Sequence, residues 1–305
     1  MSTIEKALAK QKATEQINAD QIKTKTITPA PSTDKAVFDK TSDILSQTND
    51  TDAIKSHVTP DEIPLSEARL KEHGYIFGSD SAHHIQEEFR HIKRKLINNA
   101  FGAAAKTLHH SNLVMVSSSN ANEGKTFVSI NLALSIALEQ EKTVLLIDAD
   151  VLRPSLYHEL GFEKKAGLLE FLLGEVSSLS EVIYPTSIEN LKVIPAGKPH
   201  YLTNELLAST KMEHLAKELA ERYPDRIVIF DCPPILGVTE TPVLSSLVGQ
   251  AIVVVEESKT KIDDVKRAVS QLNEDMAIGL VMNKTIRSKK DGYGYYSYGY
   301  GKKHK

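Results

Sequence analysis

The chain has 305 residues, of which 41% are hydrophobic and 25% are charged, so it can bury a sizeable core and form one large domain or two ordinary ones. Its 37 lysines and arginines stand against 40 aspartates and glutamates, and the net charge of −3 argues against a general nucleic-acid coat protein, which carries a basic excess. A single cysteine, Cys232, excludes intramolecular disulfides and cysteine-rich zinc sites and fits a reducing cytoplasm.

The N-terminal quarter differs in composition from the rest. Residues 1–70 contain no glycine and one aromatic residue, and such a stretch cannot offset its ordering entropy by burial. We therefore predict a flexible tether over residues 19–74. Before it, Ser2 and Glu5 fit a capping box, which predicts a short helix over residues 1–18. Two interpretations of that helix stay open: a frayed helix without a role, or a docking helix on a flexible leash.

From residue 75 on, apolar strands alternate with helices. The predicted strands are rich in Val, Ile and Leu without polar alternation, as strands buried on both faces are: Leu113–Ser117, Thr143–Asp148, Leu191–Ile194, Arg226–Asp231, Ala251–Glu256 and Ile278–Met282. Helices are predicted over Thr126–Gln140, Asn204–Arg222, Thr241–Val248 and Ile262–Leu272. This alternation predicts an α/β fold over residues 75–290, a mostly parallel sheet with helices on both faces.

The first predicted strand runs into a loop that reads SNANEGKT, residues 119–126, and a helix follows. This is the phosphate-binding pattern GxxxxGK[ST] with Ser119 in place of the first glycine. The backbone N–H groups of such a loop and the helix N-terminus can hold a polyphosphate. Lys125 would reach the β- and γ-phosphates, and the hydroxyl of Thr126 would bind Mg²⁺.

Three aspartates follow predicted strands at the edge where ligands bind in open α/β sheets. Asp148 and Asp150 end the second strand, just before Arg153. Asp231 follows four apolar strand residues and is the usual Mg²⁺-holding carboxylate of P-loop enzymes. The alternative, that these aspartates merely end strands, is weak because three converge on one site.

We interpret Cys232 as a small buried residue rather than a reactive thiol.

Residues 291–305 form a second break in composition. They read DGYGYYSYGYGKKHK and contain half of the ten tyrosines of the chain: Tyr293, Tyr295, Tyr296, Tyr298 and Tyr300. A segment so rich in glycine and so poor in aliphatic side chains is not expected to pack into a core. We therefore predict a disordered, tyrosine-rich tail.

The three motifs together resemble the Walker A, Walker A′ and Walker B set of the bacterial tyrosine kinases, P-loop proteins of the MinD/ParA-like branch. Shorter matches at Gly167–Gly174, Pro195–Gly197 and Glu205–Leu207 extend the resemblance over roughly residues 80–305. The resemblance implies a P-loop NTPase fold and a protein-tyrosine autokinase that uses ATP and Mg²⁺. The opening STIEKAL and the tether are most similar to stand-alone autokinases of exopolysaccharide and exosortase loci.

The resemblance also implies roles for single residues. The expected catalytic residues are Lys125, Asp148 and Asp150, and the expected metal ligands are Thr126, Asp148 and Asp231. The expected nucleotide contacts are Asn120, Ala121, Asn122, Glu123, Gly124, Lys125, Thr126, Phe127, Arg153 and Asn283, the last of these near the adenine. The chain departs from the family at Ala121, often Pro, at Asn122, often Gly, at Leu152, where many members carry Arg, and at Glu240, commonly Asp.

The run Glu87-x-x-Arg90-x-x-Lys93 resembles the family's E-x-x-R-x-x-R helix, with Lys93 for the second arginine, and implies ring-shaped self-assembly. The five tail tyrosines correspond to the family's autophosphorylation cluster, so transfer between neighbouring subunits is expected. The resemblance further implies control of exopolysaccharide polymerisation and export. It implies as partners a separate membrane-bound co-polymerase, or chain-length determinant, as activator and a protein-tyrosine phosphatase, but no nucleic acid.

The longest mostly apolar run, Phe127–Leu138, has 12 residues, whereas a helix needs about 20 to cross a bilayer. We therefore predict a cytoplasmic protein that a partner recruits to the inner face of the plasma membrane.

Two other functions stay open. A MinD/ParA-type positioning ATPase needs a lysine two residues into its loop, where this chain has Asn120, and has no reason to carry clustered tyrosines. The other is a nucleotide-binding regulator without kinase activity, which the intact Lys125, Thr126 and motif aspartates argue against.

Overall fold

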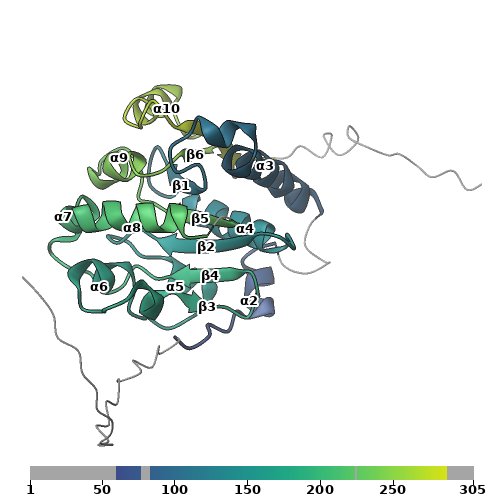
Figure 1. The fold of residues 1–305 in the computed structure, drawn as a ribbon. Coiled ribbons are helices and arrows are strands. Elements are labelled where there is room, and N and C mark those ends of the chain that lie inside the picture. Colours follow the sequence, from purple (N-terminus) through teal and green to yellow (C-terminus); the bar gives the residue numbers. More distant parts are fainter. Residues whose placement is uncertain (1–59, 77–82, 224, 287–305) are drawn as a thin grey trace, which may run out of the picture. The chain divides into compact units, whose positions relative to one another are not determined.

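Helices and strands alternate along the described part of the chain, and the strands form one sheet (Figure 1). A computed structural model describes residues 60–76, 83–223 and 225–286. The predicted docking helix, most of the predicted tether and the tyrosine-rich tail lie outside the described residues. Within these ranges, no helix is both long and apolar enough to cross a membrane.

Seven strands of the described residues lie in the order β3-β4-β2-β5-β1-β6-β7. They are β1 (Leu113–Ser118), β2 (Thr143–Asp148), β3 (Tyr184–Pro185), β4 (Leu191–Ile194), β5 (Arg226–Asp231), β6 (Gln250–Glu256) and β7 (Ala277–Asn283). Every neighbouring pair is parallel except β3 and β4. The predicted mostly parallel sheet is confirmed, and each predicted strand is present to within one residue at either end. Only β3 was not predicted, because two residues are too few to show a periodicity.

The helices either precede the first strand or lie in the connections between strands. They are α2 (Glu67–Glu72), α3 (His83–Phe101), α4 (Lys125–Ala137), α5 (Leu156–Leu160), α6 (Leu168–Leu173), α7 (Thr203–Leu207), α8 (Thr210–Glu221), α9 (Glu240–Ser245) and α10 (Ile262–Val269), with short 3₁₀ turns η1 (Ala103–Lys106) and η2 (Leu179–Val182). The helix predicted over Asn204–Arg222 is divided into α7 and α8. The hydroxyl of Ser209 accepts a hydrogen bond from the backbone N–H of Met212 at 3.3 Å, so Ser209 caps a new helix there.

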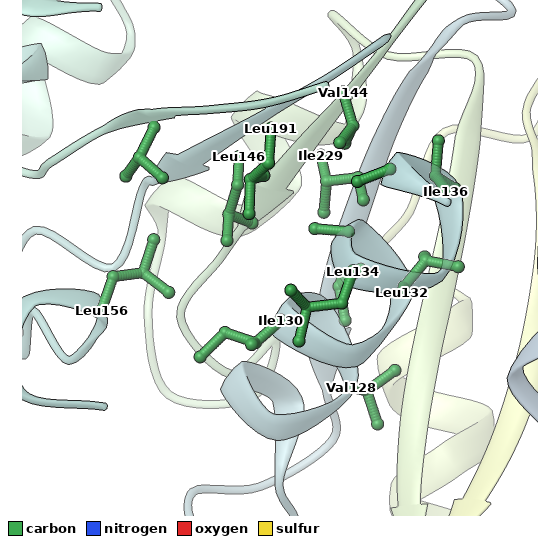
Figure 2. Packing of buried hydrophobic residues seen from close by; sticks show 14 of the residues in the cluster. Val128, Ile130, Leu132, Leu134, Ile136, Val144, Leu146, Leu156, Leu191 and Ile229 are labelled. Carbon is green, nitrogen blue, oxygen red and sulfur yellow. The ribbon is translucent and has the colours of Figure 1, made fainter. Parts of the chain in front are cut away.

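Each face of the sheet has its own buried core, because successive side chains along a strand point to opposite faces. On β1, Val114 and Val116 pack in the cluster that α3 and α4 cover, whereas Leu113 and Met115 pack in the cluster under α6 to α9. Figure 2 shows the first cluster, with apolar side chains of α4 against those of β2, β4 and β5. Because α4 is buried from Val128 to Ala137, the phosphate loop at its start rests on a rigid core element.

The predicted tether extends to residue 74, but its last part, residues 60–74, is folded. Ile63 and Leu70 are fully buried, and the backbone N–H of Ile63 donates to the carbonyl of Pro185 at 2.8 Å. The side chain of Ser66 caps α2. The average composition of residues 1–70 concealed this short apolar stretch, so residues 60–74 are corrected from tether to folded domain.

We expect Leu70→Ala to lower the free energy of unfolding by about 2–5 kcal/mol, because it empties a fully enclosed position in the core. Urea denaturation measures the change. The control is Leu138→Ala, at a side chain that is 71% exposed, where the expected change is within about 0.5 kcal/mol. Equal, small effects at both positions would mean that residues 60–76 do not belong to the folded domain.

Candidate active site

The phosphate loop connects β1 to α4, and its backbone turns sharply at two residues. Asn122 has φ +66° and Gly124 has φ +94°, both in the left-handed region. A Cβ atom at Gly124 would lie 2.0 Å from Nδ2 of Asn283, so only glycine fits there. The amide of Asn283 donates to the carbonyl of Glu123 at 2.9 Å. The end of β7 therefore braces the loop, and Asn283, predicted near the adenine, lies beside it.

Glu123 was predicted as a nucleotide contact, but its side chain faces the protein. It is 2% exposed, and its carboxylate accepts hydrogen bonds from the backbone N–H of Asn120 at 3.0 Å and from the hydroxyl of Thr260 at 2.6 Å. This carboxylate closes the loop on itself. Its side chain is therefore a support of the loop rather than a group directed at phosphate.

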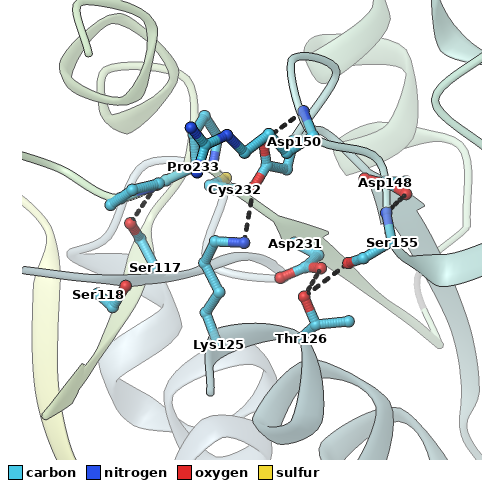
Figure 3. A network of polar contacts seen from close by, with 12 residues as sticks. Ser117, Ser118, Lys125, Thr126, Asp148, Asp150, Ser155, Asp231, Cys232 and Pro233 are labelled. Carbon is cyan, nitrogen blue, oxygen red and sulfur yellow. Dashed lines mark hydrogen bonds and ion pairs between the residues drawn. The ribbon is translucent and has the colours of Figure 1, made fainter. Parts of the chain in front are cut away.

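Thr126 and Asp231, both predicted metal ligands, are in contact (Figure 3). The hydroxyl of Thr126, in the first turn of α4, donates to Oδ2 of Asp231 at 2.7 Å and lies 2.9 Å from the hydroxyl of Ser155. The hydroxyl of Ser129 donates to the other oxygen of Asp231 at 3.1 Å. Burial raises the pKa of Asp231 to about 6, although Lys125 and the two hydroxyls that donate to it lower the pKa.

Asp148 ends β2 and is almost completely buried. Its Oδ2 accepts hydrogen bonds from the backbone N–H groups of Ser155, at 3.2 Å, and Leu156, at 3.1 Å. Its Oδ1 has no hydrogen-bond partner among the described residues. Burial and the charge of Asp231 raise the pKa of Asp148 well above its usual value. An unpartnered carboxylate oxygen in this setting fits a divalent cation, because hard cations of this kind take oxygen ligands.

Lys125 and Asp150 form an ion pair in which Nζ lies 2.6 Å from Oδ2 (Figure 3). The other oxygen of Asp150 accepts the backbone N–H of Arg153 at 3.2 Å. Burial lowers the pKa of Lys125, but the charges of Asp231 and Asp150 outweigh it and hold the pKa above its usual value. The ammonium is therefore charged and held by a carboxylate at the place where the loop can receive phosphates.

A cavity of about 630 Å³, a size typical of small-molecule sites, adjoins these groups, although Asp148 and Asp231 do not line it. Ala121, Asn122, Gly124, Lys125, Thr126, Phe127, Asp150 and Arg153 line it, as predicted nucleotide contacts or catalytic residues. Further walls, which were not predicted from the sequence, are formed by His73, Tyr75, Glu159 and the loop of residues 233–238. Only the Pro-Pro pair after Asp231 could have indicated that loop, since no motif surrounds the other three residues.

A second cavity, of about 620 Å³, lies between α3 and β7. Phe127 and Asn283 line it, together with Phe89 and Val281. Phe127, in the first turn of α4, lines both cavities.

The three residues predicted for self-assembly do not share one exposed face of α3. Glu87 and Arg90 form an exposed ion pair with each other. Lys93 is 6% exposed and donates to the carbonyl of Ser135 at 3.0 Å, so its ammonium is directed into the protein. Lys93 is therefore corrected from a residue that contacts another subunit to a residue that anchors α3 on α4. The five tail tyrosines lie outside the described residues.

Comparisons with known proteins agree with this site. Residues 111–278 match the AAA domain family. The tyrosine-protein kinase YwqD of Bacillus subtilis is 34% identical over 185 residues, which cover 60% of this chain and 76% of YwqD. The putative tyrosine-protein kinase CapB of Staphylococcus aureus is 30% identical over 214 residues, which cover 70% of this chain and 90% of CapB. Against some longer tyrosine kinases the chain spans only 26% to 31% of their length.

Among solved structures, the kinase domain of the Escherichia coli tyrosine kinase ETK superposes with a TM-score of 0.57 and 26% identity, covering 80% of this chain and 94% of that domain. The shared fold is the mostly parallel sheet with helices on both faces. The 34% identity over 76% of YwqD and the 30% identity over 90% of CapB show that the chain belongs to the family of bacterial tyrosine-protein kinases.

Proposed function

We propose that this kinase transfers the γ-phosphoryl group of ATP to the tyrosines of its own C-terminal cluster, and that this reaction controls exopolysaccharide polymerisation and export. The observation that carries the proposal is the ion pair of Lys125 with Asp150 at the wall of the cavity, beside the buried Asp148 and Asp231, whose charges also act on Lys125. Phosphoryl transfer depends mostly on positioning and on stabilising the charge of the transferred group. The ammonium of Lys125 and carboxylates suited to a divalent cation can position the transferred group and stabilise its charge.

The loop of residues 119–126 and the N-terminus of α4 would hold the phosphates through backbone N–H groups. Lys125 would turn from Asp150 to the β- and γ-phosphates. The cavity beside Asn283 and Phe127 is the candidate site for the base, because it adjoins the loop and is lined by an aromatic ring and an amide.

The residues of the site fit a magnesium ion, because one oxygen of Asp148 is unpartnered and the buried carboxylate of Asp231 lies beside the Thr126 hydroxyl. Thr126, Asp148 and Asp231 would hold it. When bound, Mg²⁺ neutralises negative charge on the phosphate oxygens.

The acceptor is the hydroxyl of a tyrosine, whose oxygen bonds to the γ-phosphorus while the bond to the β-phosphate oxygen breaks. Its proton needs a carboxylate, because a phenol with a pKa near ~10 is hardly ionised at neutral pH. Asp150 lines the cavity, and its Oδ2 becomes free once Lys125 turns to the phosphates. We therefore assign proton acceptance to Asp150 and metal binding to the more deeply enclosed Asp148.

Transfer between subunits of a ring accounts for a tail that follows the last strand. The exposed pair Glu87 and Arg90 on α3 would contact the neighbouring subunit.

Residues 1–18 would dock on a membrane-bound co-polymerase that activates the kinase at the inner face of the plasma membrane. A protein-tyrosine phosphatase would reverse the modification.

We expect Lys125→Met to lower the rate of autophosphorylation about a hundred- to a thousandfold, because it removes one charge that stabilises the transferred group. Phosphotyrosine formed with Mg-ATP measures the rate. Lys217→Met, at an exposed position on α8, is the matched control and should leave the rate unchanged. Comparable rates in the two folded variants would contradict the phosphate-loop assignment.

The two Walker A′ aspartates, Asp148 and Asp150, are expected to respond differently to substitution by asparagine. Asp148→Asn should raise the Mg²⁺ concentration needed for tight ADP binding, because it removes a metal ligand. Asp150→Asn should keep Mg²⁺-dependent ADP binding but slow phosphate transfer about a hundredfold or more, because it removes the proton acceptor. Calorimetry with ADP at several Mg²⁺ concentrations, together with phosphotyrosine formation, separates the two. The opposite pattern would exchange the two roles.

If phosphate is transferred between subunits, a catalytically inactive chain should acquire phosphotyrosine from an active neighbour. A Lys125→Met chain mixed with an active chain whose five tail tyrosines are replaced by Phe should acquire phosphotyrosine. Each chain incubated alone with Mg-ATP is the control and should remain unlabelled. If the mixture also remains unlabelled, transfer occurs within one subunit.

A further inference from the structure

Residues 60–76, called here the strap, lead into one wall of the active-site cavity. The strap is attached at its start, where Ile63 pairs with Thr186 beside β3, and in its middle, where Leu70 is buried in the core. At its end, the backbone N–H of Ile76 donates to Oδ1 of Asn131 on α4 at 2.7 Å. His73 and Tyr75 of the strap line the cavity.

Tyr75 joins two elements of the active site. Its ring stacks on Phe127, the residue after Thr126, with ring centres 5.5 Å apart. Its hydroxyl donates to Oε2 of Glu159 on α5 at 2.6 Å, and Nδ1 of His73 lies 3.2 Å from the same oxygen. Burial, aided by Glu159, raises the pKa of Tyr75, so the phenol stays a proton donor to that carboxylate.

Helix α5 has only five residues, and both its ends are engaged. The strap holds its C-terminal turn through Tyr75 and through Arg69, whose guanidinium donates to the carbonyls of His158 and Glu159. Its first N–H groups hold Asp148, as described above. The strap is therefore linked to the carboxylate of Asp148 through a single turn of helix.

Among the described residues, the hydrogen bonds to Asp148 come from Ser155, the N-cap of α5, and from Leu156, its first residue. Both reach Oδ2, and Oδ1 has no partner. Ser155, which supplies one of them, also places its hydroxyl 2.9 Å from that of Thr126. A shift of α5 would thus move Asp148 and disturb Thr126 together.

We propose that Tyr75 is a positioning residue of the kinase: through Glu159 and α5 it fixes Asp148, and through Phe127 it fixes the first turn of α4. The metal-binding residues then have their working geometry only while the strap is docked, which makes the strap part of the active site. This inference rests on the proposed role of Asp148 as a metal ligand.

The test uses Tyr75→Phe in the full chain, which removes the hydroxyl and keeps the ring on Phe127. Amide hydrogen exchange at Ser155 and Leu156, measured without metal or nucleotide, should become about fivefold faster, the factor that loss of one hydrogen bond typically brings. The Mg²⁺ concentration that half-saturates ADP binding should rise by a similar factor. Tyr201→Phe, at a side chain that is 85% exposed, is the matched control and should change neither quantity.

Glu159 provides the second pair of variants. Glu159→Leu removes the acceptor and should behave like Tyr75→Phe, whereas Glu159→Gln keeps an oxygen for the Tyr75 hydroxyl and should retain slow exchange at Ser155 and Leu156. Unchanged exchange in both Tyr75→Phe and Glu159→Leu would overturn the proposal, and so would equal acceleration in Glu159→Leu and Glu159→Gln.

The exchange experiment is independent of catalysis, so it separates this inference from the proposed function. If Lys125→Met retained autophosphorylation, the proposed function would fail while the exchange result would still decide the role of Tyr75. If Tyr75→Phe left exchange unchanged, the inference would fail while Lys125→Met would still test the kinase mechanism.

Discussion

The burial of three carboxylates around one ammonium is the constraint on which the site depends. Asp148, Asp150 and Asp231 are each almost fully buried. Lys125 forms an ion pair with Asp150, and the charges of all three carboxylates act on it. Burying charge in excess of its partners is costly, and here the cost is visible as raised carboxyl pKa values at Asp148 and Asp231. A divalent cation held as proposed would remove this excess, and Lys125 would then be available for phosphate.

The strands and the site motifs could be predicted because they follow local rules. The central strands β1, β2 and β5 are buried on both faces, so their sequences are unbroken apolar runs, and parallel strands bring the residues that follow them to one edge. That is why Asp148 and Asp231, 83 residues apart, could be assigned to one site. Strand β3 could not be predicted, since its two residues are a strand only through pairing with β4.

The misassignment of Lys93 has a geometric cause. On a helix, residues three or four apart share a face, and a step of six turns the side chain by about 240° from the first. Glu87 and Arg90 therefore meet each other, whereas Lys93 meets α4. A motif spaced at three and six spans more than one face, so its last residue can support the helix while the first two remain available to another subunit.

The walls formed by His73, Tyr75 and Glu159 could not be predicted, because nothing local marks them. Tyr75 and Glu159 are 84 residues apart and meet only because α2 packs over the end of α5. The strap also precedes the AAA domain match, which begins at residue 111, and the kinase-like motifs of the sequence, which begin near residue 80. A domain boundary drawn from motifs at residue 75 would therefore remove His73, Arg69 and the core residue Leu70 and leave Tyr75 at a chain end. Since the cavity and the contacts of α5 include these residues, the catalytic unit must include the strap.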